Sequence, residues 1–151
     1  MTSYKKILKP GRDQSRTLQA LTELKKVIAD YPASDQAKAA QDKIRDCEER
    51  LALHNSEIAK LYYRRRAVRA AISRFTEIMS LYPGYSRLDE VYFYLGDCHF
   101  LMNQFDQAKP FFTKVVTDYS GRKTAKKAAS RLAEIERRKA APPSAPKAKK
   151  R

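Results

Sequence analysis

The sequence predicts an all-α protein made of helical hairpins that repeat and stack as a short α-solenoid, with one long helix among them. Only 4 of its 151 residues are Gly, and strong helix formers such as Ala, Leu, Lys and Glu are abundant. A nine-residue block also recurs three times without gaps, at 24–32 (Leu-Lys-Lys-Val-Ile-Ala-Asp-Tyr-Pro), 75–83 and 112–120. An alanine stands four residues before each block, at Ala20, Ala71 and Ala108.

The repeat extends upstream of the blocks and has a recognisable pattern. The second and third blocks are 37 residues apart, and Leu-Gly followed by His at 95–99 matches Ile-Ala followed by Tyr at 58–62. Leu-Gly-x2-Tyr, then Ala-x3-Phe, then Pro is the tetratricopeptide-repeat (TPR) pattern, with a period of about 34 residues. Each unit is then two antiparallel helices, in which alanine allows close approach and phenylalanine fills the gap. The predicted repeat core is Ala20, Leu24, Ile58, Tyr62, Ala71, Phe75, Leu95, Gly96, Ala108 and Phe112.

Six helices follow from this register, near residues 15–30, 35–64, 68–81, 87–101, 105–118 and 122–139. The second is long because the first two blocks are 51 residues apart, and the 14 extra residues make about four helical turns. No Gly or Pro separates 33 from 83, so the turn at 65–68 is predicted from the repeat spacing alone.

Two local signals mark the boundary between the third and fourth helices. Pro83 ends the third helix, because the residue before a proline is forced out of the α region. Ser86 and Asp89 then have the spacing of a capping box for the fourth helix.

The charge distribution divides the chain into three parts. We expect a flexible segment at 1–13, a TPR-like domain at 14–139 and a disordered basic tail at 140–151, which has three prolines. The net charge is +15, of which 137–151 contribute +7. Nearly half of the excess therefore lies at the C-terminus, where it would attract polyanions or an anionic surface.

Motifs for catalysis, cofactors or metals are missing from the sequence. It contains no Gly-rich phosphate loop, no Gly-x-Ser-x-Gly and no His-Glu-x-x-His. Neither His54 nor His99 has ligand partners at zinc spacing, so both are interpreted as core or interface residues. We therefore predict a protein that is not an enzyme and has no cofactor, no metal site and no small-molecule substrate.

The two cysteines and two acidic pairs are assigned structural places. Cys47 and Cys98 are each 16 residues after the tyrosine of their block, where the third block has Ile135, so they are expected to be buried apolar positions. The pairs at 48–49 (Glu-Glu) and 89–90 (Asp-Glu) are expected on solvated helix faces.

The densest basic cluster within the predicted domain is the candidate partner-binding site. It comprises Arg64, Arg65, Arg66, Arg69 and Arg74. One interpretation is a solvated surface near a helix turn. The functional interpretation is a patch that pairs with acidic residues of a protein partner, for which the planar guanidinium is suited. Nucleic acid is an unlikely ligand, because no motif interleaves aromatic residues with these bases.

One longer stretch goes beyond a generic TPR. Residues 47–63 read Cys-Glu-Glu-Arg-Leu-Ala-Leu-His-Asn-Ser-Glu-Ile-Ala-Lys-Leu-Tyr-Tyr, and 70–75 read Ala-Ala-Ile-Ser-Arg-Phe, followed by Leu-Tyr-Pro at 81–83. Together with Arg-Asp-Gln-Ser at 12–15, this resembles the BamD family of outer-membrane-assembly lipoproteins over about 12–136. Asn55 and Ser120 depart from the family's usual glutamate and third proline.

The resemblance implies a scaffold rather than a catalyst. Family members dock through their C-terminal repeats on the last POTRA domain of the barrel protein BamA, work with other assembly-complex subunits and help deliver unfolded β-barrel precursors. Arg74 matches the arginine of the family's Ala-Ile-x-Arg-Phe motif, which the resemblance places near the BamA contact. The family's signal peptide, lipobox cysteine and first repeats have no counterpart in this sequence, so only the partner-docking part is matched.

Two expectations for function and location stay open. The resemblance implies the periplasmic face of the outer membrane, whereas the chain as given, with no leader and no apolar stretch of about 18–20 residues, would be cytoplasmic. In that second case it would be a TPR adaptor whose basic tail binds nucleic acid or another polyanion, with an affinity that falls steeply with salt.

The repeat register can be tested at its small position. Ala71→Leu is expected to overpack the helix pair and lower the free energy of unfolding by about 1–3 kcal/mol, measured by urea denaturation. A neutral result would show that the register is wrong.

Overall fold

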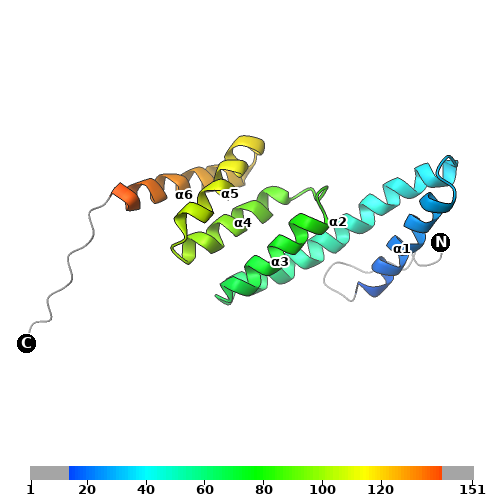
Figure 1. Cartoon of the computed structure of the whole chain (residues 1–151), viewed down its shortest axis with the longest axis horizontal. Helices are drawn as coiled ribbons and strands as arrows, with labels where there is room; N and C mark the ends of the chain where they lie inside the picture. The colour runs from blue at the N-terminus through cyan, green and yellow to red at the C-terminus, as the bar shows by residue number, and fades with distance from the viewer. Residues whose placement is uncertain (1–13, 141–151) are drawn as a thin grey trace, which may run out of the picture. The chain divides into compact units, whose positions relative to one another are not determined.

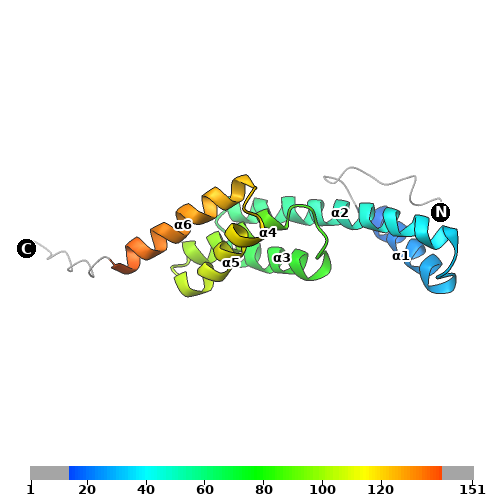
Figure 2. The same ribbon diagram turned by 90° about the horizontal axis from the view of Figure 1, so that it is seen from above.

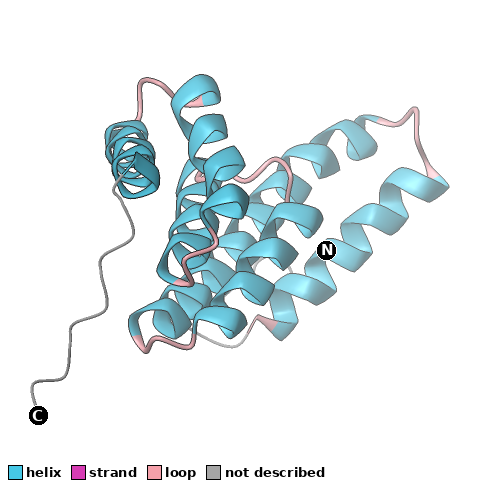
Figure 3. Ribbon diagram, turned by 60° about the vertical axis from the view of Figure 1, so that its left-hand side comes forward, coloured by secondary structure: helices cyan, strands magenta, loops and turns pink. Residues whose placement is uncertain are grey.

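The computed structural model describes residues 14–140, and the expected all-α fold is confirmed for them. They contain no strand and form helices joined by short loops (Figure 3). The helices, labelled in Figure 1, are α1 (Ser15–Asp30), α2 (Asp35–Arg64), α3 (Val68–Leu81), α4 (Leu88–Leu101), α5 (Phe105–Asp118) and α6 (Lys123–Ala140). Each predicted helix boundary lies within one residue of the observed one. The expected flexible segment at 1–13 and the basic tail from 141 onward lie outside the described residues, and Ala140 ends α6.

The chain falls into two compact units, which meet between Val91 and Tyr92 within α4. In the N-terminal unit, α1 and α3 both pack along the long helix α2 (Figures 1 and 2). One cluster of the core joins α1 to the first half of α2 and contains Ala20, Leu24, Ala40 and Cys47. Phe75 of α3 is also completely buried, as the α-hairpin register predicts for an aromatic gap filler.

The side chains of Ser34 and Glu49 bind backbone N–H groups at the starts of α2 and α4 in the N-terminal unit. Ser34 caps α2, since its Oγ accepts a hydrogen bond from the Ala37 N–H at 3.0 Å, and Asp35 complements the positive end of the helix. Ahead of α4, Ser86 donates its backbone N–H to the Glu49 carboxylate of α2 at 3.0 Å. A carboxylate 37 residues upstream thus binds the residue at which the capping box was expected, and it links α2 to the start of α4.

The C-terminal unit has a core between α5, α6 and the second half of α4. Its buried residues are Phe100, Ala108, Phe112, Val115, Ala125, Ala128 and Ile135. A Cβ placed on Gly96 of α4 would lie only 2.8 Å from Cε1 of the Phe112 ring on α5. The absence of a side chain at Gly96 is therefore what lets the aromatic ring lie against the α4 backbone.

The ten repeat-core candidates divide into two groups by burial. Eight are buried: Ala20, Leu24, Ala71, Phe75, Leu95, Gly96, Ala108 and Phe112. Ile58 and Tyr62, near the C-terminal end of α2, are only half-buried.

The contact between Gly96 and Phe112 yields a prediction with a matched control. Gly96→Ala would overpack a fully buried ring, at a cost of about 2 kcal/mol. Better helix propensity returns at most about 1 kcal/mol of this, so we expect a net loss of stability in guanidinium denaturation. Gly84→Ala, whose Cβ would meet no atom within 4 Å, should change stability by less than about 0.5 kcal/mol. A Gly96→Ala protein more stable than the parent would contradict the contact.

Candidate protein-interaction surface

Four of the five candidate arginines lie around the turn between α2 and α3. Arg64 is the last residue of α2, Arg65 and Arg66 form the turn, and Arg69 is in the first turn of α3. All four side chains are exposed. None of them forms an ion pair with any residue between 14 and 140. We call these four residues the turn arginines.

The turn has the hydrogen bonds of a Schellman motif, in which the residue after the helix cap adopts a left-handed conformation. The Ala67 N–H donates to the Tyr62 carbonyl and the Arg66 N–H donates to the Tyr63 carbonyl, both at 3.0 Å. Arg66 has a φ of 61°, a region in which glycine or asparagine is favoured and most other side chains are strained. The turn therefore exposes an arginine at a position where arginine costs stability.

The same motif recurs 37 residues later with a residue that suits it. Asn103 has a φ of 58°, its N–H donates to the Phe100 carbonyl at 3.0 Å, and the Gln104 N–H donates to the His99 carbonyl at 2.9 Å. Asn103 could have signalled the earlier turn, because it marks the equivalent repeat position. Composition alone offers no such signal at Arg66, which is why only the spacing predicted the turn.

Arg74 is separate from the turn arginines. It lies five residues after Arg69 on α3, which corresponds to a rotation of about 140° around the helix axis. Its Nη1 is 3.3 Å from Oε2 of Glu77, one turn further along, and both side chains are about half exposed. Arg74 is thus a second cationic point on α3 rather than part of one continuous cluster.

The expectation that the acidic pairs lie on solvated faces is wrong for Asp89, which is buried, whereas Glu48, Glu49 and Glu90 are partly exposed and each binds another segment. Glu48 pairs with Lys25 of α1 at 3.2 Å, and its neighbour Glu49 holds the residue before α4. Asp89 is only 4% exposed, and Glu90 pairs with Lys60 of α2. Helix propensity and local pattern assign these acids to the surface, whereas packing places each of them opposite another segment.

The cysteines and His99 have structural surroundings. Cys47 and Cys98 are free thiols with no exposed surface, and burial raises their pKa values to about 11 and about 12. Such thiols are protonated at neutral pH and react slowly as nucleophiles. The Nδ1 atom of His99 is 2.8 Å from Oε1 of Gln104. The His99 ring stacks on the Phe111 ring, with the ring centroids 5.7 Å apart.

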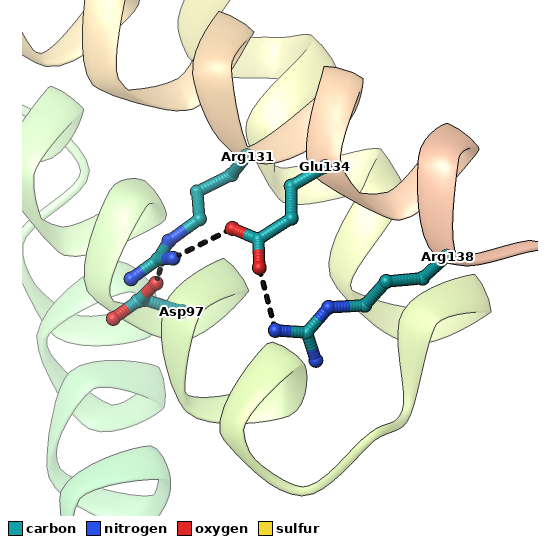
Figure 4. A network of polar contacts seen from close by, with 4 residues as sticks. All are labelled: Asp97, Arg131, Glu134 and Arg138. Atoms are coloured by element: carbon teal, nitrogen blue, oxygen red, sulfur yellow. Dashed lines mark hydrogen bonds and ion pairs between the residues drawn. The ribbon is translucent and has the colours of Figure 1, made fainter. Parts of the chain in front are cut away.

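A polar network holds α6 to α4 in the C-terminal unit (Figure 4). Asp97 of α4 is 1% exposed, and its Oδ1 accepts a hydrogen bond from Arg131 Nε at 2.6 Å. Arg131 Nη1 also reaches Glu134 at 3.1 Å, and the other oxygen of Glu134 accepts from Arg138 at 2.5 Å. Both arginines lie over the Phe100 ring, at 4.6 and 4.7 Å from its centroid.

The network shifts the pKa values of Glu134 and Arg131 in opposite directions. The hydrogen bond from Arg138, supported by Arg131, lowers the pKa of Glu134. Burial alone would lower the pKa of Arg131, but the carboxylates of Asp97 and Glu134 together outweigh it, so the pKa of Arg131 is raised. Both shifts favour the charged forms of Glu134 and Arg131. Sequence reasoning missed this network, because Asp97 and Arg131 are 34 residues apart and no motif links them.

Residues 14–140 contain no candidate metal cluster and no candidate membrane-spanning helix. No three His, Cys, Asp or Glu side chains gather in a way that could hold a metal ion. None of the helices there combines the length and the apolar character needed to cross a bilayer.

The stacked helical hairpins define a TPR-type helical-repeat protein. A family model described as YfiO, outer membrane lipoprotein, matches residues 1–109. The chain therefore belongs to this family of outer membrane lipoproteins. The outer membrane protein assembly factor BamD of Caulobacter vibrioides is 29% identical over 106 residues, which are 70% of this chain and 35% of that protein. The chain spans about a third of the length of that relative.

The polar network can be tested by removing its central arginine. Arg131→Met would leave the buried Asp97 carboxylate without its guanidinium, so we expect a loss of about 3 kcal/mol in the free energy of unfolding. Arg137→Met is the matched control, because Arg137 is exposed on the same helix and has no ion pair within residues 14–140. Equal effects of the two substitutions in chemical denaturation would show that the buried pair is unimportant.

Proposed function

We propose that this chain is a non-catalytic docking scaffold of outer membrane β-barrel assembly, acting at the periplasmic face of the outer membrane. Membership of the YfiO family and the similarity to an assembly factor named BamD support this role. The partner we propose is a BamA-type POTRA domain, bound through the turn arginines and Arg74. Other assembly-complex subunits and unfolded β-barrel precursors are further partners of the proposed scaffold.

The observation that carries the proposal is the state of the turn arginines. These four are exposed around one turn and form no ion pair within residues 14–140, whereas other arginines in that state, such as Arg16 and Arg137, are isolated along their helices. One of them, Arg66, occupies a left-handed position at a cost in stability. Strained residues that persist on a surface are typical of functional positions. Guanidinium groups also match carboxylates in a bidentate geometry.

Arg66 should show opposite effects on stability and on binding. Arg66→Gly removes the left-handed strain, so we expect unfolding to require about 1 kcal/mol more free energy. The same change removes a cation of the docking surface, and affinity for the BamA periplasmic domain should fall several-fold in calorimetric titration.

Asn103→Gly provides the matched control for Arg66→Gly. Asn103 occupies the equivalent turn in the C-terminal unit and tolerates its conformation, so both stability and affinity should change little. A stabilised Arg66→Gly protein that binds as tightly as the parent would remove Arg66 from the docking surface.

Arg74 tests the second cationic point. Arg74→Glu should weaken binding to the BamA periplasmic domain at least tenfold while the helical circular dichroism signal stays intact, because its exposed pair with Glu77 contributes little to stability. Lys114→Glu is the matched control, since Lys114 has a similarly exposed intrahelical pair with Asp118. Unchanged affinity of the Arg74→Glu protein would exclude Arg74 from the contact.

A further inference from the structure

The outer face of α6 is a cationic helix surface with a shallow centre. The term outer face of α6 denotes five exposed residues: Lys126, Lys127, Ser130, Ala133 and Arg137. Two hollows border this face. One of about 410 Å³ is lined by Phe93 of α4 together with Lys126, Lys127, Ser130 and Arg131, and one of about 280 Å³ is lined by Ser130, Ala133, Glu134 and Arg137. Small residues thus separate two lysines at one end from an arginine at the other.

In α4, the equivalent helix one repeat earlier, another helix packs on the corresponding face. Residues 130, 133 and 137 correspond, 37 positions earlier, to Phe93, Gly96 and Phe100 of α4. Helix α5 covers those three positions. The Phe112 ring lies against Gly96, and its centroid is 5.9 Å from the centroid of the Phe93 ring. The centroids of the Phe105 and Phe100 rings are 5.5 Å apart. The same face of α6 is therefore the one on which the repeat places a following helix, and α6 carries no helix there within residues 14–140.

The acids of α6 are neutralised by neighbouring cations, including Glu134, which borders the outer face. Glu134 pairs with Arg131 and Arg138, and Glu136 pairs with Lys109 of α5. Lys126, Lys127 and Arg137 form no ion pair with any residue between 14 and 140. The three cations therefore leave the outer face with an excess of positive charge beside the already paired Glu134, which suits carboxylates and disfavours cationic partners.

The charge of residues 141–151 argues against this segment as the occupant of the outer face. Residues 141–151 contain Lys147, Lys149, Lys150 and Arg151 and no acid, so their charge is the same as that of the face they follow. The family match ends at residue 109, before α6 begins. The residues of the outer face therefore lie outside the part of the chain that the family model matches.

We propose that the outer face of α6 binds an acidic amphipathic helix of a partner protein. The helix lies where the repeat would place its next helix, with a large apolar side chain over Ala133 in the way that Phe112 lies over Gly96. Carboxylates on either side of that residue pair with Lys127 and Arg137. This surface is distinct from the turn arginines and does not depend on the role proposed for them.

The first experiment uses a designed probe with the full chain. The probe is a labelled 18-residue alanine-based helical peptide with one central phenylalanine and glutamates three and four residues to either side of it. A matched peptide has glutamine in place of every glutamate. We expect the acidic peptide to bind at least tenfold more tightly in fluorescence anisotropy, with amide shifts in NMR spectra centred on α6.

Two variants separate charge from shape. Lys127→Glu with Arg137→Glu should reduce affinity for the acidic peptide at least tenfold, whereas Arg16→Glu with Lys26→Glu, the same charge change at exposed positions of α1, should not. Ala133→Arg keeps the face positive but fills its centre, so it should also reduce peptide affinity at least tenfold.

Several outcomes would overturn the proposal. Equal binding of the acidic and the glutamine peptides would exclude recognition by charge. If Ala133→Arg leaves peptide binding unchanged, and single-stranded DNA or phosphatidylglycerol vesicles bind equally well, the face is a general polyanion surface. If the parent dimerises in sedimentation and the double charge reversal on α6 abolishes the dimer, the occupant is a second copy of this chain.

Discussion

The contact between a residue without a side chain and an aromatic ring sets how closely neighbouring helices approach in the C-terminal unit. Gly96 leaves the α4 backbone open, and the Phe112 ring fills the space, with no exposed surface of its own. Buried Ala108 and Val115 on the same helix complete a core in which volume leaves little freedom. Because α5 is held in this way, α6 packs on α5 at a distance where Arg131 can reach Asp97.

Charge in this protein has two different uses. Carboxylates such as Asp97 and Glu49 are directed at other segments of the chain, where they bind a guanidinium or the residue before a helix. A buried carboxylate needs such partners, because desolvation without them would cost several kcal/mol. The cations in excess of these pairs include the turn arginines and those on the outer face of α6. Each of the two units therefore has an exposed cationic surface of its own.

The turn between α2 and α3 illustrates how a local rule is broken on an otherwise regular scaffold. The Schellman hydrogen bonds at Arg66 and at Asn103 are equivalent, so the backbone solution is a property of the repeat. Only the side chain differs, and asparagine is the residue that the conformation favours. A scaffold selected for stability alone would carry glycine or asparagine at both turns. Arg66 is therefore the departure from local preference on which the proposed docking role rests.

The sequence by itself determined the fold class, the six helices and the close-packing pairs, because a 37-residue period and a 3-4 apolar spacing are local properties of the chain. The recurrence of alanine before each phenylalanine led directly to Ala71 with Phe75 and Ala108 with Phe112, all four of them buried. The basic cluster was also visible, although helix geometry separates Arg74 from the others. Tertiary structure decided what no local pattern encodes: which acids are buried, the left-handed conformation of Arg66, and the pairing of Asp97 with Arg131. The physical reason for the pairing of acids across segments is that it joins residues tens of positions apart, whose meeting depends on how whole helices pack. The turn at Arg66 is local, but its residue types carry no signal for it.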